Sequence, residues 1–250
     1  MRSFVLQTRV MQESHTAENL SEFLKSAVNE WKLKRLEMPS LSTYNARSIL
    51  NAGKLAGVEP HIGCVAHTIN LGTQRGLQVK QLETLLGRIR RVVTYFHKSS
   101  TATTILKSKQ AILEIQQHKL IMAVSTRWNS TYDMLERFLE QQPAIIATLM
   151  MKDLKKNIKD VYTLSEMDIS SAERVMSVVK PIKTVTTILS GESFPTVSMI
   201  HPLKEMLLQQ LRKVNNEDDK LVSDVKKAIS QYLESRCEYL IINQFYNNKN

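Results

Sequence analysis

The chain has 250 residues and a formal net charge of +10 at pH 7. Hydrophobic residues make up 42% of the sequence, enough for a packed core of one large or two smaller domains, and no apolar run is long enough to span a bilayer. With only 7 Gly and 6 Pro, a turn-rich all-β fold is excluded, and the two cysteines cannot form a disulfide framework. Composition therefore predicts a mainly helical, intracellular protein whose surface attracts polyanions, above all nucleic acid.

The first part of the chain shows strand patterns. Residues 3–10 have the β-branched and aromatic content of a short strand. Residues 36–44 occupy the place of a second strand, although Pro39 fits a central strand poorly because it cannot donate to a ladder. Residues 62–72 predict a strand that leads into a helix.

All other elements are predicted as helices, because apolar residues recur at spacings of three and four. Pro143 is expected to open a helix and Pro181 to kink one. The predicted helices cover approximately residues 16–31, 46–55, 79–96, 101–117, 128–139, 143–150, 165–189, 199–207 and 218–240.

Three short motifs stand out: TYNARS at 43–48, GCVAHTINL at 63–71 and STRWNST at 125–131. Cys64 and His67 are three residues apart, so they share one face of a helix and either bind a metal together or pack into a core. Two ligands do not close a tetrahedral zinc site, and we favour the structural role.

In this order, and with SHT at 14–16 upstream, the motifs resemble the hAT superfamily of cut-and-paste DNA transposases, most closely its zinc-finger BED domain-containing relatives. The resemblance implies an α/β plus all-α architecture that is mostly α overall. A partial RNase H-like fold of two or three strands with helices is expected at 1–78, followed by an all-helical insertion at 79–240. Residues 241–250 are expected to be an unrelated or disordered tail.

The resemblance also implies that this chain is not an enzyme. In the family, a metal-binding Asp ends the second strand, but Tyr44 stands at that position here, with Asn45 and Ala46 retained beside it. A phenol with a pKa of about 10 cannot replace a carboxylate as a ligand of a hard cation. The family's other two acids are expected to lie outside this chain, before Met1 and beyond the insertion.

No cofactor is expected in this chain. Active relatives use Mg²⁺ or Mn²⁺, and zinc belongs to the BED finger, which is expected outside this sequence together with the C-terminal dimerisation segment.

The predicted DNA-binding residues are Arg127 and Trp128 and the arginines Arg88, Arg90 and Arg91. The Trp that matches Trp128 in the transposases lies near a base turned out of the stack; from the residues alone, a Trp at this position is more often a core side chain. Arg127 is expected either to pair with phosphate or to brace Asp133, and the helix arginines either contact DNA or are merely solvated. Cys64, His67 and Asn70 are expected to hold the fold together.

The preferred hypothesis is a catalytically inactive middle piece of a domesticated hAT-type transposase. It would act in the nucleus in DNA association or protein assembly. DNA is the expected partner, with possible protein partners or a homo-oligomer formed through the absent C-terminal region, and no membrane. The alternatives are a fragment of an active transposase and a helical protein-interaction domain that does not bind DNA.

Overall fold

The computed structural model describes residues 7–33, 40–43, 45–58, 61–124, 127–151, 154, 164–191, 197–215 and 218–245. Within these ranges it contains nine helices and one two-stranded parallel sheet. The chain forms two compact units. One comprises Met1–Ile69, Ile188–Lys204 and Leu233–Asn250, and the other comprises Asn70–Thr187 and Glu205–Tyr232.

The first unit contains a β-α-β arrangement. Strand β1 (Leu41–Thr43) pairs in parallel with β2 (His61–Gly63), and helix α2 (Arg47–Ala56) connects them. The register joins the last residue of β1 to the last residue of β2. Helix α1 (Ala17–Glu30) packs against α2.

Two local features position α2. It ends at Gly57, which adopts the left-handed backbone conformation (φ 68°) that glycine accepts without a steric cost. Gly53 lets the helix lie close to the strands, because a Cβ there would be 3.1 Å from Leu41 Cδ2 and 3.2 Å from His61 Nδ1.

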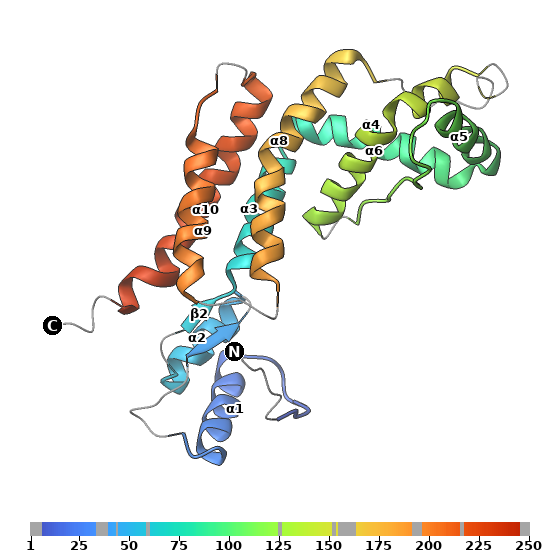
Figure 1. Ribbon diagram of the computed structural model, residues 1–250. Coiled ribbons are helices and arrows are strands. Elements are labelled where there is room, and N and C mark those ends of the chain that lie inside the picture. Colours follow the sequence, from blue (N-terminus) through green and yellow to red (C-terminus); the bar gives the residue numbers. More distant parts are fainter. Residues whose placement is uncertain are drawn as a thin grey trace. The chain divides into compact units, whose positions relative to one another are not determined.

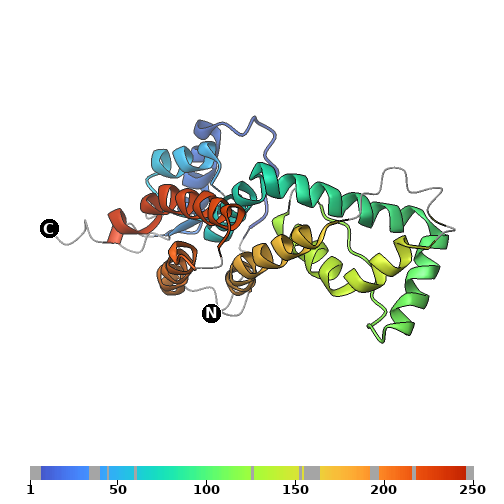
Figure 2. The same cartoon turned by 90° about the horizontal axis from the view of Figure 1, so that it is seen from above.

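The second unit is built on helices α4 (Lys80–Lys98), α5 (Ser100–Ile112) and α6 (Trp128–Leu149), which contact one another (Figures 1 and 2). Every three or four residues, α4 presents an apolar side chain that is at most 3% exposed. These side chains are Leu82, Leu85, Leu86, Ile89, Val92, Val93 and Phe96.

Four further helices have residues in both units. They are α3 (Val65–Leu77), α8 (Glu166–Leu189), α9 (Val197–Arg212) and α10 (Lys220–Phe245). In the part of the chain that the structure describes, no helix combines the length and the apolar character needed to cross a membrane.

The predicted fold class is confirmed: the described chain is mostly helical with a small parallel sheet. Of the strand predicted at 3–10, the described residues 7–10 are not a strand, and Val10 is 87% exposed. The described part of the second predicted strand is β1. Tyr44, the residue after β1 in the sequence, lies outside the described residues. The domain boundary at 78/79 and the tail from 241 stay predictions.

Two helix boundaries were predicted wrongly. The helix expected at 101–117 ends at Ile112, because Glu114 adopts a positive φ of 53° and the Ile115 N–H turns back to the Gln110 carbonyl at 2.9 Å. Pro143 does not open a helix; it lies inside the continuous helix α6, where the buried Ala144 and Ile145 keep the C-terminal half packed.

A buried ion pair closes the connection between α9 and α10. Lys226 Nζ donates to Asp218 Oδ2 at 2.6 Å and to the Lys213 carbonyl at 3.0 Å, and the Asn215 N–H also donates to Asp218. The two charged side chains are only 9% and 11% exposed. The hydrogen bond from Lys226 outweighs the effect of burial and holds the pKa of Asp218 below its ordinary value.

Replacing Gly76 should destabilise the protein, whereas replacing Gly87 should not. A Cβ at Gly76 would lie 2.5 Å from Ile229 Cγ1, and Ile229 is fully buried; around a Cβ at Gly87 there is nothing within 4 Å. We expect Gly76→Ala to lower the free energy of unfolding by about 1–3 kcal/mol and Gly87→Ala to raise it by up to about 1 kcal/mol. Urea denaturation of both variants measures this, and equal effects would contradict the close approach of α3 and α10.

Asp218→Asn should have an effect that depends on pH. The carboxylate's contribution is present above its unfolded pKa and is lost as pH falls through the lower pKa of the folded state. We therefore expect the variant to be less stable by about 2 kcal/mol near neutral pH. The difference in Tm from the unmodified chain should narrow as the pH is lowered toward about 3. A difference that stays constant with pH would contradict the ion pair.

Candidate nucleic-acid interface

The turn before α6 positions Arg127 and Trp128. Arg127 is the N-cap residue of α6, in an extended conformation, and its N–H donates to the Val124 carbonyl at 3.1 Å. The Ser130 hydroxyl accepts a hydrogen bond from the Val124 N–H at 2.8 Å and lies 2.7 Å from the Arg127 carbonyl. The predicted helix start in the STRWNST motif is thus confirmed, with Ser130 holding the turn.

Trp128 is a buried side chain of the second, helical unit. It is 2% exposed and packs edge-to-face with Tyr132, with the ring centroids 6.3 Å apart. Burial and a hydrogen bond to Glu136 raise the pKa of Tyr132 to about 12, so its hydroxyl stays protonated. The Trp128 Nε1–H is buried and has no hydrogen-bond partner among the described residues. This burial fits the core alternative for Trp128, and its role in binding DNA stays a prediction.

A cleft of about 380 Å³ brings Trp128 and Arg90 together. Gln74 from α3, Gln78 just after α3 and Glu83 from α4 also line it. The cleft therefore combines one cation, one carboxylate, two amides and an indole within one unit. Amide, guanidinium and indole groups of this kind are the usual partners of phosphates and bases.

The other arginines of α4 are engaged differently. Arg88 Nη1 donates to Asp168 Oδ2 at 2.8 Å, and its Nη2 pairs with the other carboxylate oxygen. The Ser165 N–H and hydroxyl also donate to Asp168, which stands in the first turn of α8. Burial raises the pKa of Asp168, but the hydrogen bonds from Arg88 and Ser165 outweigh it and hold the pKa below its ordinary value. Arg88 thus ties α4 to the start of α8, while Arg91 is exposed and has an interaction partner of its own.

Arg127 is exposed, and its side chain has no hydrogen-bond or ion-pair partner in the described ranges. It does not brace Asp133, because Asp133 pairs with Lys183 Nζ at 2.9 Å. Lys183 also lies 5.5 Å from the centroid of the Tyr132 ring. The structure thus does not show the bracing of Asp133 that was one expected role of Arg127, and its contact with phosphate stays a prediction.

The Cys-His segment links β2 to α3. The Cys64 N–H donates to the Thr43 carbonyl at 2.9 Å, which extends the strand pairing by one residue. The Cys64 carbonyl accepts from the Thr68 hydroxyl at 3.2 Å, and Asn45 Nδ2 donates to that hydroxyl at 2.8 Å. Cys64, His67 and Asn70 are half-buried.

Asn45 is a structural residue that the sequence motif did not assign. Its amide joins the chain after β1 to the first turn of α3, and the only sequence signal was its place in the TYNARS motif. Among the described residues there is no group of three His, Cys, Asp or Glu side chains that could hold a metal ion. The expectation that this chain binds no cofactor stays a prediction.

The Asn45–Thr68 contact can be tested with two threonine variants. Thr68 is 1% exposed, so Thr68→Val should lower the free energy of unfolding by about 1–2 kcal/mol, because the half-buried Asn45 amide loses its nearer acceptor and keeps only the Cys64 carbonyl at 3.4 Å. Thr84→Val is the matched control, since the exposed Thr84 hydroxyl contacts only the Lys80 carbonyl of its own helix. Denaturation of both variants measures the difference, which would vanish if Asn45 did not hold α3.

Comparison with known proteins gives three matches. Residues 62–178 match the family model described as the ZBED1 RNase-like helical domain. The chain is 24% identical to the Homo sapiens "Zinc finger BED domain-containing protein 4" over 190 residues, which cover 74% of this chain and 15% of that protein. It is 23% identical to the Zea mays "Putative AC transposase" over 266 residues, which cover 94% of this chain and 32% of that protein. The chain thus spans less than a third of the length of either relative.

Proposed function

Because this chain is related to the hAT transposase-derived, BED-type zinc finger proteins, as its three motifs predicted, we propose that it is a catalytically inactive piece of such a protein that associates with DNA in the nucleus. The observation that carries the proposal is the cleft shared by Arg90 and Trp128. Arg127, whose side chain has no partner among the described residues, precedes Trp128 in the sequence. A net charge of +10 supplies the general attraction to a polyanion.

The cleft suits a nucleic acid by size, and its positive charge comes from Arg90, which shares the lining with the carboxylate of Glu83. A cavity of about 150 Å³ accepts a benzene molecule, so 380 Å³ leaves room for a base and part of its sugar. Arg90 and Arg127 would contact phosphates, which gives affinity without sequence specificity. Trp128 is too buried to offer its ring face, so in this proposal it forms part of the cleft wall and does not stack on a base.

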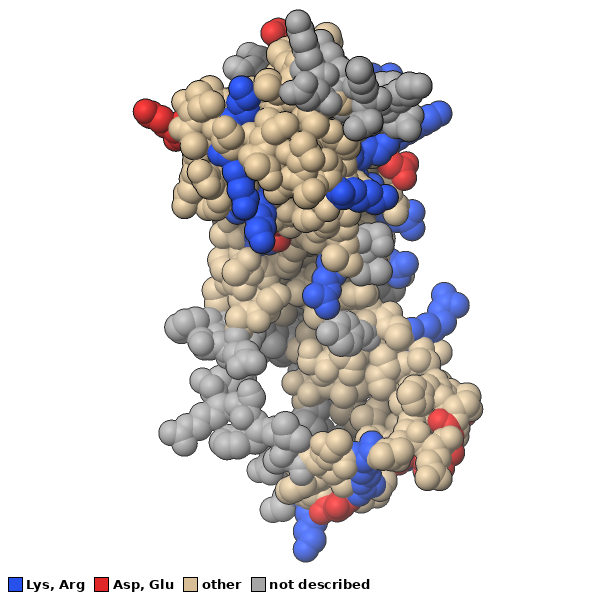
Figure 3. Space-filling model, turned by 90° about the vertical axis from the view of Figure 1, so that its right-hand side faces the viewer, with Lys and Arg blue, Asp and Glu red and all other residues tan. Residues whose placement is uncertain are grey.

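Basic side chains also gather outside the cleft. Figure 3 shows Lys and Arg side chains scattered over this view, with Asp and Glu side chains also present. The excess of basic residues in the sequence adds to the general attraction for a phosphate backbone.

The proposed inactivity rests on Tyr44. The residue before it, Thr43, ends β1 and pairs with Gly63, the residue before Cys64. The pairing of the segment that ends at Thr43 with the segment that precedes Cys64 is compatible with the motif alignment, in which Tyr44 matches the family's metal-binding Asp in the sequence. A phenol there does not bind Mg²⁺ or Mn²⁺ at neutral pH.

Removing the two arginines should weaken DNA binding in a salt-dependent way. We expect Arg90→Gln/Arg127→Gln to lower the salt dependence of log K by about 2, one for each lost phosphate contact. Lys180→Gln/Lys227→Gln is the matched control, because it removes two exposed charges elsewhere on the same unit. Fluorescence anisotropy with single-stranded and duplex DNA at about 50 mM and 200 mM salt measures both variants. Trp128→Ala is unsuitable, because loss of a buried Trp costs about 3–5 kcal/mol of stability.

Catalysis is tested separately. The purified chain should not cut or transfer DNA strands in the presence of Mg²⁺ or Mn²⁺, and neither should the Tyr44→Phe variant. Turnover by the unmodified chain would overturn the proposed inactivity and favour a fragment of an active transposase.

One observation favours a second candidate, a helical interaction domain that does not bind DNA. Arg88 is held in an ion pair with Asp168, so at least one predicted phosphate contact serves the fold instead. Equal DNA affinity at the two salt concentrations would support this second candidate.

A further inference from the structure

A second pocket lies within the second, helical unit. It shares no lining residue with the Arg90–Trp128 cleft. It is formed by the end of α4, by α5 and by the segment 117–120, and its volume is about 230 Å³. Small-molecule and cofactor pockets usually have about 300–1,000 Å³. A cavity of about 150 Å³ is sufficient for benzene, so this pocket has the size for a single aromatic side chain.

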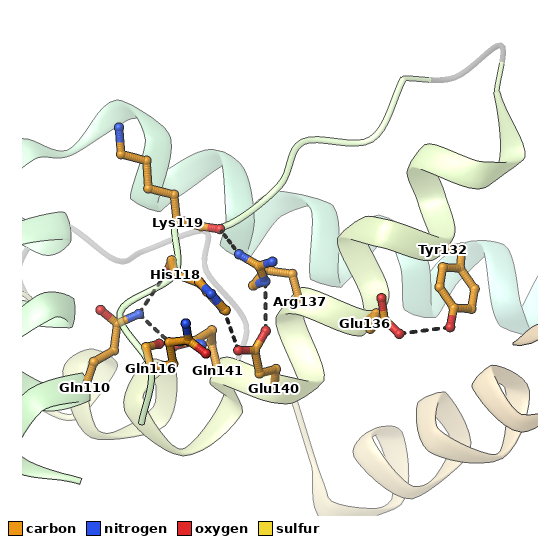
Figure 4. A network of polar contacts seen from close by, with 9 residues as sticks. All are labelled: Gln110, Gln116, His118, Lys119, Tyr132, Glu136, Arg137, Glu140 and Gln141. Atoms are coloured by element: carbon orange, nitrogen blue, oxygen red, sulfur yellow. Dashed lines mark hydrogen bonds and ion pairs between the residues drawn. The ribbon is translucent and has the colours of Figure 1, made fainter. Parts of the chain in front are cut away.

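Hydrogen bonds fix the walls of this pocket. Gln110 Nε2 donates to Gln141 Oε1 at 2.6 Å and to the His118 carbonyl at 3.0 Å, and both glutamines are at most 1% exposed (Figure 4). Gln141 Nε2 donates to the Gln116 carbonyl at 3.0 Å, and His97 Nε2 donates to the Leu120 carbonyl at 2.9 Å. The segment after α5 is thereby held in place, and the pocket is preformed.

The floor is mainly apolar, and the polar residues that line the pocket include Thr103 and Gln110. Phe96, Leu106 and Leu120 line it and are each at most 6% exposed. Gln110 also lines it, and its Oε1 accepts no hydrogen bond from any described residue; Figure 4 shows this oxygen on the side of Gln110 opposite Gln141. A ligand with an apolar ring and one hydrogen-bond donor would pack against the apolar side chains and donate to Gln110 Oε1.

The rim is cationic. Lys107 and Lys119 are exposed, and neither ammonium group pairs with any of the described residues. Figure 4 shows the Lys119 side chain directed away from Arg137 and Glu140. The described residues that line the pocket include no Asp or Glu, so nothing within it neutralises these charges.

From these features we infer that the pocket is a docking site for an acidic peptide segment of a partner protein, with one Tyr or Trp side chain as the anchor. The ring would fill the pocket, and its hydroxyl or indole N–H would donate to Gln110 Oε1. Neighbouring Asp or Glu residues of the peptide would meet Lys107 and Lys119. A nucleobase fits less well, because it has several polar groups and most of the floor is apolar. This interaction is independent of the proposed association with DNA.

The test uses synthetic peptides and the whole chain. A fluorescent peptide of sequence DEDYEDE is titrated with the protein, and its Tyr→Ala and Tyr→Phe forms are measured in the same way. We expect the Ala form to bind at least tenfold more weakly and the Phe form about threefold to tenfold more weakly, because Phe keeps the ring and loses the donor.

Two charge variants complete the test. Lys107→Gln/Lys119→Gln should weaken binding of the Tyr peptide about fivefold to tenfold, with circular dichroism unchanged, whereas Lys180→Gln/Lys227→Gln should leave it unaltered. Equal binding of the Tyr and Ala peptides would overturn the inference, since charge alone would then explain it. Equal weakening by the two double variants would also overturn it. So would an oligonucleotide that binds in place of the peptide and loses affinity in Lys107→Gln/Lys119→Gln.

Discussion

The buried apolar stripe of α4 is the constraint on which the helical unit depends. An α-helix turns by about 100° per residue, so once the stripe faces the core, the direction of every other side chain on α4 is fixed. Arg88 and Arg90 therefore point to nearly opposite sides of the helix. One meets Asp168 at the start of α8, and the other meets the cleft beside Trp128. The same periodicity thus assigns one arginine to the fold and leaves the other for a ligand.

Much of the architecture could be predicted from the sequence, because in most helices the apolar residues recur at a clear spacing of three and four. The apolar spacing in α4, the turn before α6 and Gly57 after α2 each depend on neighbouring residues only. The errors at Glu114 and Pro143 have another origin: a non-glycine residue accepts a left-handed conformation, and a proline stays inside a helix, because tertiary packing compensates for the local cost.

The site was less predictable, because its contacts join residues that are distant in sequence. No local pattern shows that Asn45 reaches Thr68, that Arg88 pairs with Asp168, or that Asp133 takes Lys183 as its partner. The STRWNST motif correctly predicted a helix that starts at Trp128, but it did not predict how deeply the Trp128 side chain is buried. Composition supplied the positive charge, and only the fold separates the paired cations from the unpaired ones.

The amide pair of Gln110 and Gln141 has a consequence for how this molecule can change over time. If one of them alone became a hydrocarbon, the other amide would keep its backbone carbonyl partner but lose the hydrogen bond between the two side chains, at a position that is at most 1% exposed. A change to leucine at one site is therefore expected to favour a matching change at the other, although the two residues are 31 positions apart in the sequence. Such a paired exchange would also remove two hydrogen bonds that hold the segment after α5.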